Sequence, residues 1–178
     1  MGKTITRPPK TIMEIYKGLP EGTLAELIND QIYMSPSPLA KHQVLLNEIN
    51  FSLKKFLDQN NLGTVLTAPL DVYLDETSNA VQPDIIVILE NNMHILDENG
   101  HINGVPDLLV EVLSPGNRDH DLIIKRDLYE KFGVKEYWAV DPETKLALGF
   151  ILKDGKYHQF SDKIGEVDSR LWETKFTF

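Results

Sequence analysis

Apolar side chains recur at two different spacings along the chain, and the helical spacing appears twice. Between residues 37 and 57 they repeat at about 3.6 residues, as on one face of a helix, and Ser37 and Pro38 are typical of the cap and first turn. A second helical pattern covers residues 119–132 and stops at Gly133, which suits a left-handed helix end. The sequence therefore predicts two main helices.

Shorter apolar runs alternate with polar residues and predict strands. Residues 107–113 are apolar on both faces apart from Asp107 and Glu111, as expected of a central strand covered on both sides. Two short runs around Asn29-Asp30, within residues 26–34, predict a hairpin ahead of the first helix. The other predicted strands lie at residues 64–74, 83–89, 136–140, 146–152 and 157–160. This order predicts an α/β fold with a mixed central sheet flanked by helices and an N-terminal hairpin extension.

Bulk composition favours one domain in the cytoplasm. The chain has 178 residues, of which 42% are hydrophobic, and no repeat divides it, so we expect one domain over residues 11–178. Residues 1–10 are basic and contain two prolines, which predicts a flexible arm. No apolar run suits a membrane span or a secretory leader, so we expect no membrane contact. The absence of cysteine excludes disulfides and thiolate metal sites and agrees with a cytoplasmic location.

The negative charge is concentrated in one part of the sequence. The net charge is −9, and residues 71–111 contain nine acidic side chains but no Lys or Arg, so the other 18 acidic residues balance the 18 basic ones. A protein that coats or packages DNA non-specifically would be basic, so the composition argues against this class. A metallonuclease is not excluded, because its metal-binding carboxylates are themselves a negative cluster. An acidic solubilising surface explains Asp75, Glu76, Asp97 and Glu98.

Three charged residues lie where the pattern predicts burial. Asp84 opens the apolar run at residues 83–89, Glu111 interrupts the run at 107–113, and Lys125 is on the inward face of the second helix. A buried charge costs several kcal/mol unless it is paired or bound to a ligand. If Asp84 and Glu111 share a face of neighbouring strands, they can bind one divalent cation, and oxygen ligands favour Mg²⁺ or Mn²⁺ over zinc. With a lysine ammonium nearby, this chemistry suits phosphodiester hydrolysis.

Several other residues have two interpretations each. Lys125 and Asp121 are four residues apart and could form only a helix ion pair. His42 is either a core histidine or a phosphate or water contact at the edge of the site, with Glu26 nearby. Asp107 either binds a second metal or shapes the start of its strand. The basic residues Lys41 and Arg118 are either phosphate contacts or ordinary surface charges.

Longer motifs resemble a known superfamily. Pro83-Asp84 followed by Glu111-Val112-Leu113-Ser114 resembles the PD-(D/E)XK nucleases, although Leu113 stands where their lysine is expected. Some branches supply that lysine from the following helix, where Lys125 lies. More specifically, the chain resembles the Uma family of restriction-endonuclease-like bacterial proteins. The segments that carry this resemblance are residues 104–115 and 133–142, Asp121 with Lys125 and Tyr129, and residues 26–28 and 34–42.

The resemblance implies a restriction-endonuclease-like core and a Mg²⁺- or Mn²⁺-dependent endonuclease that acts on DNA. In that interpretation Asp84 and Glu111 are metal ligands and Lys125 is the catalytic lysine. Glu26, His42, Asp107 and Asp121 are accessory candidates. A homodimer would suit the cutting of both strands, because that needs two sites. The alternative is a nuclease-fold binding or regulatory module without turnover.

Overall fold

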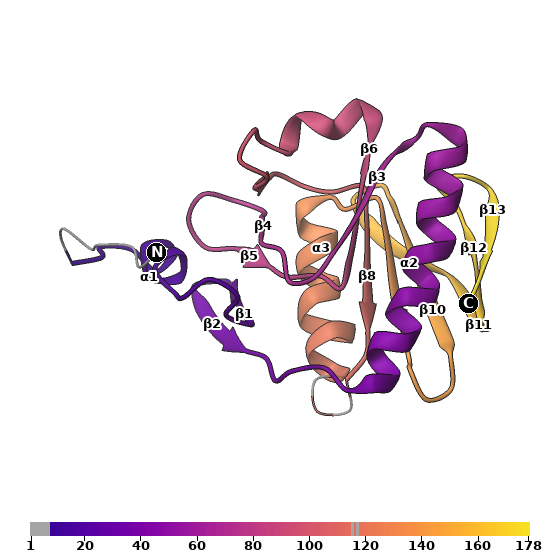
Figure 1. Cartoon of the computed structure of the whole chain (residues 1–178), viewed down its shortest axis with the longest axis horizontal. Coiled ribbons are helices and arrows are strands. Elements are labelled where there is room, and N and C mark those ends of the chain that lie inside the picture. The colour runs from indigo at the N-terminus through magenta and orange to yellow at the C-terminus, as the bar shows by residue number, and fades with distance from the viewer. Residues whose placement is uncertain (1–7, 115, 117) are drawn as a thin grey trace.

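A computed structural model describes residues 8–114, 116 and 118–178, and its largest sheet has six strands (Figure 1). The strand order is β11-β10-β9-β8-β6-β3, and all neighbours are antiparallel except β8 and β9, which are parallel. The strands are β3 (Gly63–Thr67), β6 (Ile85–Leu89), β8 (Leu108–Val112), β9 (Glu136–Val140), β10 (Leu146–Lys153) and β11 (Lys156–Ile164). The predicted α/β fold with a mixed central sheet is confirmed.

A smaller sheet contains the predicted hairpin. Its order is β2-β1-β5-β4-β7, and the short helix α1 (Ile12–Lys17) packs on it through Met13 and Tyr16. The hairpin turn at Asn29-Asp30 is confirmed, since both residues have positive φ. β1 also pairs with β5, so the hairpin is one edge of a larger unit. The strands are β1 (Ala25–Ile28), β2 (Gln31–Met34), β4 (Val72–Tyr73), β5 (Ala80–Val81) and β7 (Ile102–Asn103).

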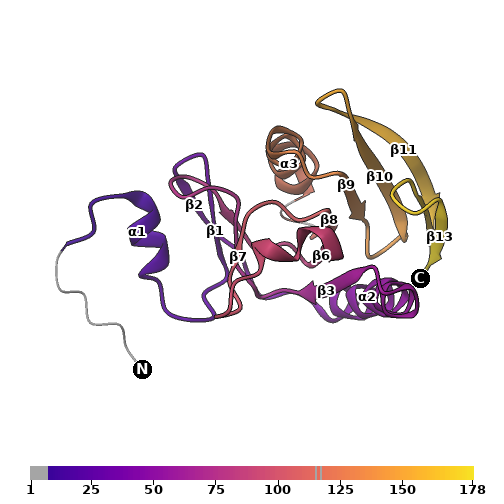
Figure 2. The ribbon, with the colours of Figure 1, turned by 90° about the horizontal axis from the view of Figure 1, so that it is seen from above.

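Helices cover the two faces of the six-stranded sheet. Figure 2 shows α2 (Ala40–Asn60) on one face and α3 (Arg126–Phe132) on the other. The apolar stripe of α2 packs against alternate side chains of β6, β8 and β9, and the hairpin of β12 (Glu166–Ser169) and β13 (Thr174–Thr177) completes this core. The α3 side packs on the other alternate side chains and on residues of the small sheet. Alternation along each strand therefore fixes which residues face which helix.

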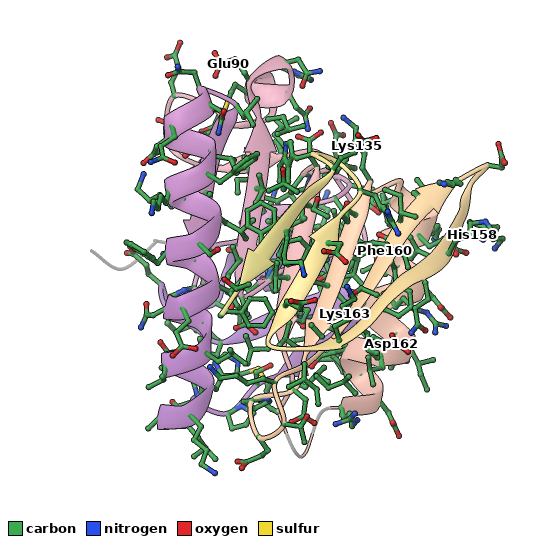
Figure 3. All side chains as sticks on the ribbon, turned by 90° about the vertical axis from the view of Figure 1, so that its right-hand side faces the viewer. Glu90, Lys135, His158, Phe160, Asp162 and Lys163 are labelled. Carbon is green, nitrogen blue, oxygen red and sulfur yellow. The ribbon has the colours of Figure 1, made fainter. Side chains whose placement is uncertain are left out.

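The outer part of the six-stranded sheet is the long hairpin of β10 and β11. Its turn at Asp154-Gly155 is confirmed, since both residues have positive φ. Figure 3 labels Phe160 on β11. Its ring lies against Gly149 of β10, where an added Cβ would come within 2.6 Å of the ring. The glycine is therefore required by this close packing.

The prediction of one continuous strand over residues 64–74 is wrong. β3 ends at Thr67, a cis peptide joins Ala68 to Pro69, and the chain then enters β4 in the small sheet. Because Pro69 has no N–H, it cannot continue the hydrogen-bond ladder of β3. The prediction treated one apolar run as one strand, whereas the proline divides it between two sheets.

The start of the first predicted helix and the type of the second need correction. The first helix begins at Ala40 instead of Pro38, because Leu39 is extended, and no side chain, Ser37 included, caps its first turn. The second helix begins as a π-helix, η2 (His120–Lys125), and continues as α3, which ends at Gly133 in the predicted left-handed conformation. A 3₁₀ helix, η1 (Glu90–Ile95), was not predicted.

Two further predictions concern the N-terminal arm and contact with a membrane. Residues 1–7 of the predicted arm lie outside the described residues, while residues 8–10 are exposed and belong to no helix or strand. Within the described part of the chain, no helix is both long enough and apolar enough to cross a membrane.

Candidate active site

The two strand carboxylates meet on the α3 side of the six-stranded sheet. Ile85 of β6 pairs with Val110 of β8, and this antiparallel register places Asp84 opposite Glu111. Asp84 Oδ2 accepts a hydrogen bond of 2.8 Å from the backbone N–H of Val112. The backbone of β8 therefore fixes the Asp84 carboxylate next to the strand that carries Glu111.

Lys125 faces inward, as predicted, and its ammonium lies among three carboxylates. Its Nζ is 2.8 Å from Glu111 Oε1, 2.9 Å from Glu26 Oε1 and 3.6 Å from Asp121 Oδ1. Burial alone would lower the Lys125 pKa, but the charges of Glu111, Glu26 and Asp121 outweigh it and hold the pKa well above its usual value. The lysine is thus protonated, and the helix pair with Asp121 is the longest of its three ion pairs.

Glu26 joins the small sheet to this cluster. It lies on β1, and its Oε1 also accepts a 2.8 Å hydrogen bond from the backbone N–H of Gln82. Its Oε2 lies 3.4 Å from His120 Nε2. Burial raises the Glu26 pKa, but the charge of Lys125 and the hydrogen bonds from His120, Gln82 and Lys125 lower it to about 2. Glu26 is therefore an ionised partner of Lys125.

His120 is a site residue that the sequence analysis missed. The inward face of the second helix was predicted from α-helical spacing, but η2 is a π-helix, whose backbone hydrogen bonds join residues five apart. His120 and Lys125 are five apart, and both contact Glu26. The ring of His120 also packs on Tyr33 of β2, with centroids 4.8 Å apart. No feature of the sequence pattern marked the change in helix type.

Tyr129 contributes a hydroxyl to the site in addition to filling the core. It is fully buried, and its hydroxyl donates a 2.7 Å hydrogen bond to Glu111 Oε1, the same oxygen that Lys125 contacts. Burial raises the Glu111 pKa well above its usual value; the charge of Lys125 opposes this, and those of Asp121, Asp84 and Glu26 add to it. Burial and the neighbouring carboxylates therefore disfavour the charged form of Glu111.

His42 is a core histidine with a polar contact to the site. It lies on the buried face of α2, and its Nε2 is 3.1 Å from Asp84 Oδ2. Burial lowers the His42 pKa, but the hydrogen bond and charge of Asp84 outweigh this and raise it. His42 and the Val112 N–H thus hold the same oxygen of Asp84.

A cavity of about 160 Å³ lies between the two sheets and the starts of the two helices, and its lining includes Lys125, His42 and the carboxylates described above, but not His120 or Tyr129. The segment Ser35–Pro38 forms one wall and Ala68-Pro69 another. Four acidic residues line it, and Lys125 is the only Lys or Arg among its described lining residues. The acidic residues are Glu26, Asp84, Glu111 and Asp121. The cavity is therefore a small polar site with one buried cation.

The comparison with known families agrees with this arrangement. Residues 13–167 match the model of the Uma2 family, which is described as "Putative restriction endonuclease". The chain belongs to the Uma2 family. Among solved structures, this Uma2 chain is similar to a protein from Anabaena variabilis ATCC 29413 described as a "putative nuclease belonging to DUF820". The TM-score is 0.73 at 22% identity, over 93% of this chain and 92% of that one, which shows a shared fold. No curated protein matches the chain.

The donor atoms of the Uma2 site fit a hard divalent cation. Among the described residues, no group donates a hydrogen bond to Asp84 Oδ1 or Glu111 Oε2, so both oxygens have free lone pairs. The described residues contain no group of three or more His, Cys, Asp or Glu side chains arranged around a metal. Mg²⁺ does not need one, because it commonly uses one or two carboxylates and completes its shell with water and phosphate.

Asp107 lies apart from the Uma2 cavity at the other end of β8. Its Oδ2 accepts hydrogen bonds from the Leu89 backbone at 2.8 Å and from Asn92 at 3.0 Å, and its Oδ1 pairs with Lys135 at 2.6 Å. Both oxygens are thus used to join β8 to β6, η1 and Lys135. Of the two interpretations of Asp107, the structure favours the one in which it shapes the start of the strand.

Replacing Asp107 with alanine is expected to lower the free energy of unfolding by about 1–3 kcal/mol, because the partly buried donors of Leu89 and Asn92 lose their buried acceptor. Denaturant unfolding of the variant tests this. Cation binding at the cavity should stay at the wild-type affinity when it is measured well below the melting temperature. A variant that lost the cation but kept its stability would instead place Asp107 in the site.

Proposed function

We propose that this Uma2-family chain is a metal-dependent endonuclease that hydrolyses phosphodiester bonds in DNA. Asp84 and Glu111 would hold Mg²⁺ or Mn²⁺, and Lys125 would act as the catalytic lysine. The observation that carries the proposal is the convergence of these three side chains in one cavity, together with a family described as restriction endonucleases. A buried ammonium among carboxylates is costly to build, which supports a role in chemistry.

Each residue has a separate task in this proposal. When bound, the cation supplies Lewis-acid stabilisation of the charge that develops on the phosphate. Lys125 places its ammonium 2.8 Å from Glu111, where it can orient the nucleophile or offset the same developing charge. Tyr129 holds Glu111 Oε1, and His42 holds Asp84 Oδ2, so the other oxygen of each carboxylate would be left to bind the cation. Glu26 and Asp121 balance the charge of the lysine, and His120 contacts the second oxygen of Glu26.

A second candidate is a binding or regulatory module with the nuclease fold. One observation favours it: Glu111 and Glu26 both lie within 2.9 Å of the Lys125 ammonium, so the lysine is well satisfied without a substrate. In that case the buried ion network would only stabilise the junction of the two sheets. The two candidates differ in turnover, not in binding.

The test is incubation of the full chain with a mixture of DNA and RNA substrates while Mg²⁺ or Mn²⁺ is titrated. Cleavage that requires the metal and disappears in chelator supports the nuclease. Glu111→Ala, purified in the same way, controls for contaminating nucleases and should show none. If the wild type cuts neither DNA, RNA nor simple phosphodiesters, the binding module becomes the better proposal.

Two predictions remain alongside this proposal. A homodimer stays a prediction, which sedimentation or light scattering would test. A cytoplasmic location also stays a prediction.

A further inference from the structure

We infer, on the basis of the proposed nuclease function, that the substrate enters this site as a single, unpaired strand and not as an intact duplex. Three independent features support this: the depth of the functional groups, the charge around the cavity and the apolar side chains beside it.

The functional groups lie too deep for a phosphate that is held in a duplex. The exposed fraction of the side chain is 16% for Asp84, 4% for Glu111 and 5% for Lys125. The cavity, at about 160 Å³, is smaller than the roughly 300–1,000 Å³ of a typical small-molecule pocket. A phosphate in a duplex carries the stacked bases and the second strand with it. An unpaired strand can instead bend so that one phosphate reaches the carboxylates, as in enzymes that act on extruded or single-stranded nucleotides.

Few basic side chains near the cavity are available to bind the phosphates of a substrate. Lys125 is the only Lys or Arg among the described lining residues, and it is already paired with carboxylates. Lys41 precedes the lining residue His42, but it pairs with Glu143; Arg118 precedes η2, but it pairs with Asp141. Proteins that hold a duplex electrostatically use about 6–10 phosphate contacts. This site is acidic, so we expect a substrate that is held at only a few phosphates.

Exposed apolar side chains flank the wall of the cavity. Met34 and Leu39 stand at the two ends of the lining segment Ser35–Pro38, with 64% and 70% of their surface exposed. Ile123, between the lining residues Asp121 and Lys125, is 51% exposed. The bases of an unpaired strand present flat apolar faces that can pack on such side chains, whereas stacking hides these faces in a duplex.

The experiment compares three labelled DNAs of one sequence in Mn²⁺: a single strand, a blunt duplex, and a duplex with an unpaired flap. The expected result is cleavage of the single strand and of the flap at least tenfold faster than the blunt duplex, with cuts confined to unpaired nucleotides. A blunt duplex that is cut as fast as the single strand would overturn the inference and leave the nuclease proposal standing.

If no DNA is cut, a binding measurement tests the inference instead. Fluorescence anisotropy with Glu111→Gln should show tighter binding of the single strand and a weak dependence on salt. Equal or tighter binding of the duplex, or no binding of either DNA, would count against it. The double variant Met34→Ser/Leu39→Ser should weaken single-strand binding at least threefold. Phe51 is an apolar residue on α2 that is 69% exposed. Phe51→Ser in the Glu111→Gln protein is the matched control, and it should bind the single strand as tightly as Glu111→Gln does.

Discussion

Replacing Lys125 with methionine is expected to lower the cleavage rate by about two to four powers of ten, which is about 3–5 kcal/mol of transition-state stabilisation. The methionine keeps most of the volume of the lysine stem but has no charge to orient a nucleophile or to offset charge on the phosphate. The measurement is the cleavage rate on DNA in Mn²⁺. A variant that cuts at the wild-type rate would show that the lysine is not catalytic.

The same change also affects stability, and a second variant separates the two effects. Lys125→Met leaves Glu26 and Glu111 without their cation, and loss of one partner of a buried pair costs about 3–5 kcal/mol. Glu26→Gln/Lys125→Met removes one charge of each sign and should recover part of the lost stability. If the lysine is catalytic, this double variant stays inactive, while Glu26→Gln alone retains cleavage. Recovery of cleavage together with stability would point to a structural lysine.

Replacing Asp84 with asparagine is expected to remove the strong divalent-cation site. A neutral amide keeps an oxygen for the Val112 N–H but binds Mg²⁺ or Mn²⁺ far more weakly than a carboxylate does. Titration calorimetry should show heat for the wild type and no saturable binding for Asp84→Asn in the same concentration range. Glu111→Gln should give the same loss, because it supplies the other free oxygen.

Thermal melts in chelator control for unfolding of these two variants. Burial raises the Glu111 pKa, so its charged form is unfavourable in the folded protein, and the neutral glutamine should keep or raise the melting temperature. A large loss of stability in Asp84→Asn without metal would mean that the aspartate is structural. Unchanged cation binding in both variants would place the metal elsewhere.

The central strands and helices, and the side chains that each of them turns inward, were predictable because they depend on local periodicity. Alternation along a strand places Glu111 on the face opposite Val110 and Val112, and the helical repeat places Lys125 inward. The register between β6 and β8, with Ile85 opposite Val110, then brings Asp84 to Glu111. The identity of the metal and of the substrate stays a prediction, since neither depends on the fold alone.

The parts that were missed depend on non-local structure. The contact between Glu26 and Lys125 was missed because Glu26 lies on β1 of the small sheet and Lys125 on η2, so only the tertiary fold joins them. His120 reaches Glu26 because η2 is a π-helix, which the spacing of apolar residues does not reveal. The run at residues 64–74 looks continuous in sequence, but its first strand ends before Pro69, and the residues after Pro69 join the small sheet. Each error follows from treating one segment in isolation.

The contact between Glu26 and Lys125 also limits where the chain can be truncated. The N-terminal hairpin looks like an appendage, and a minimal catalytic core beginning at α2 would seem a natural choice. Such a truncation would remove the Glu26 carboxylate from Lys125 and His120 and leave the β1 side of β5 without its partner strand. The small sheet therefore supplies a counter-charge to the helix that covers the larger sheet, so a change to one of the two sheets also affects the other.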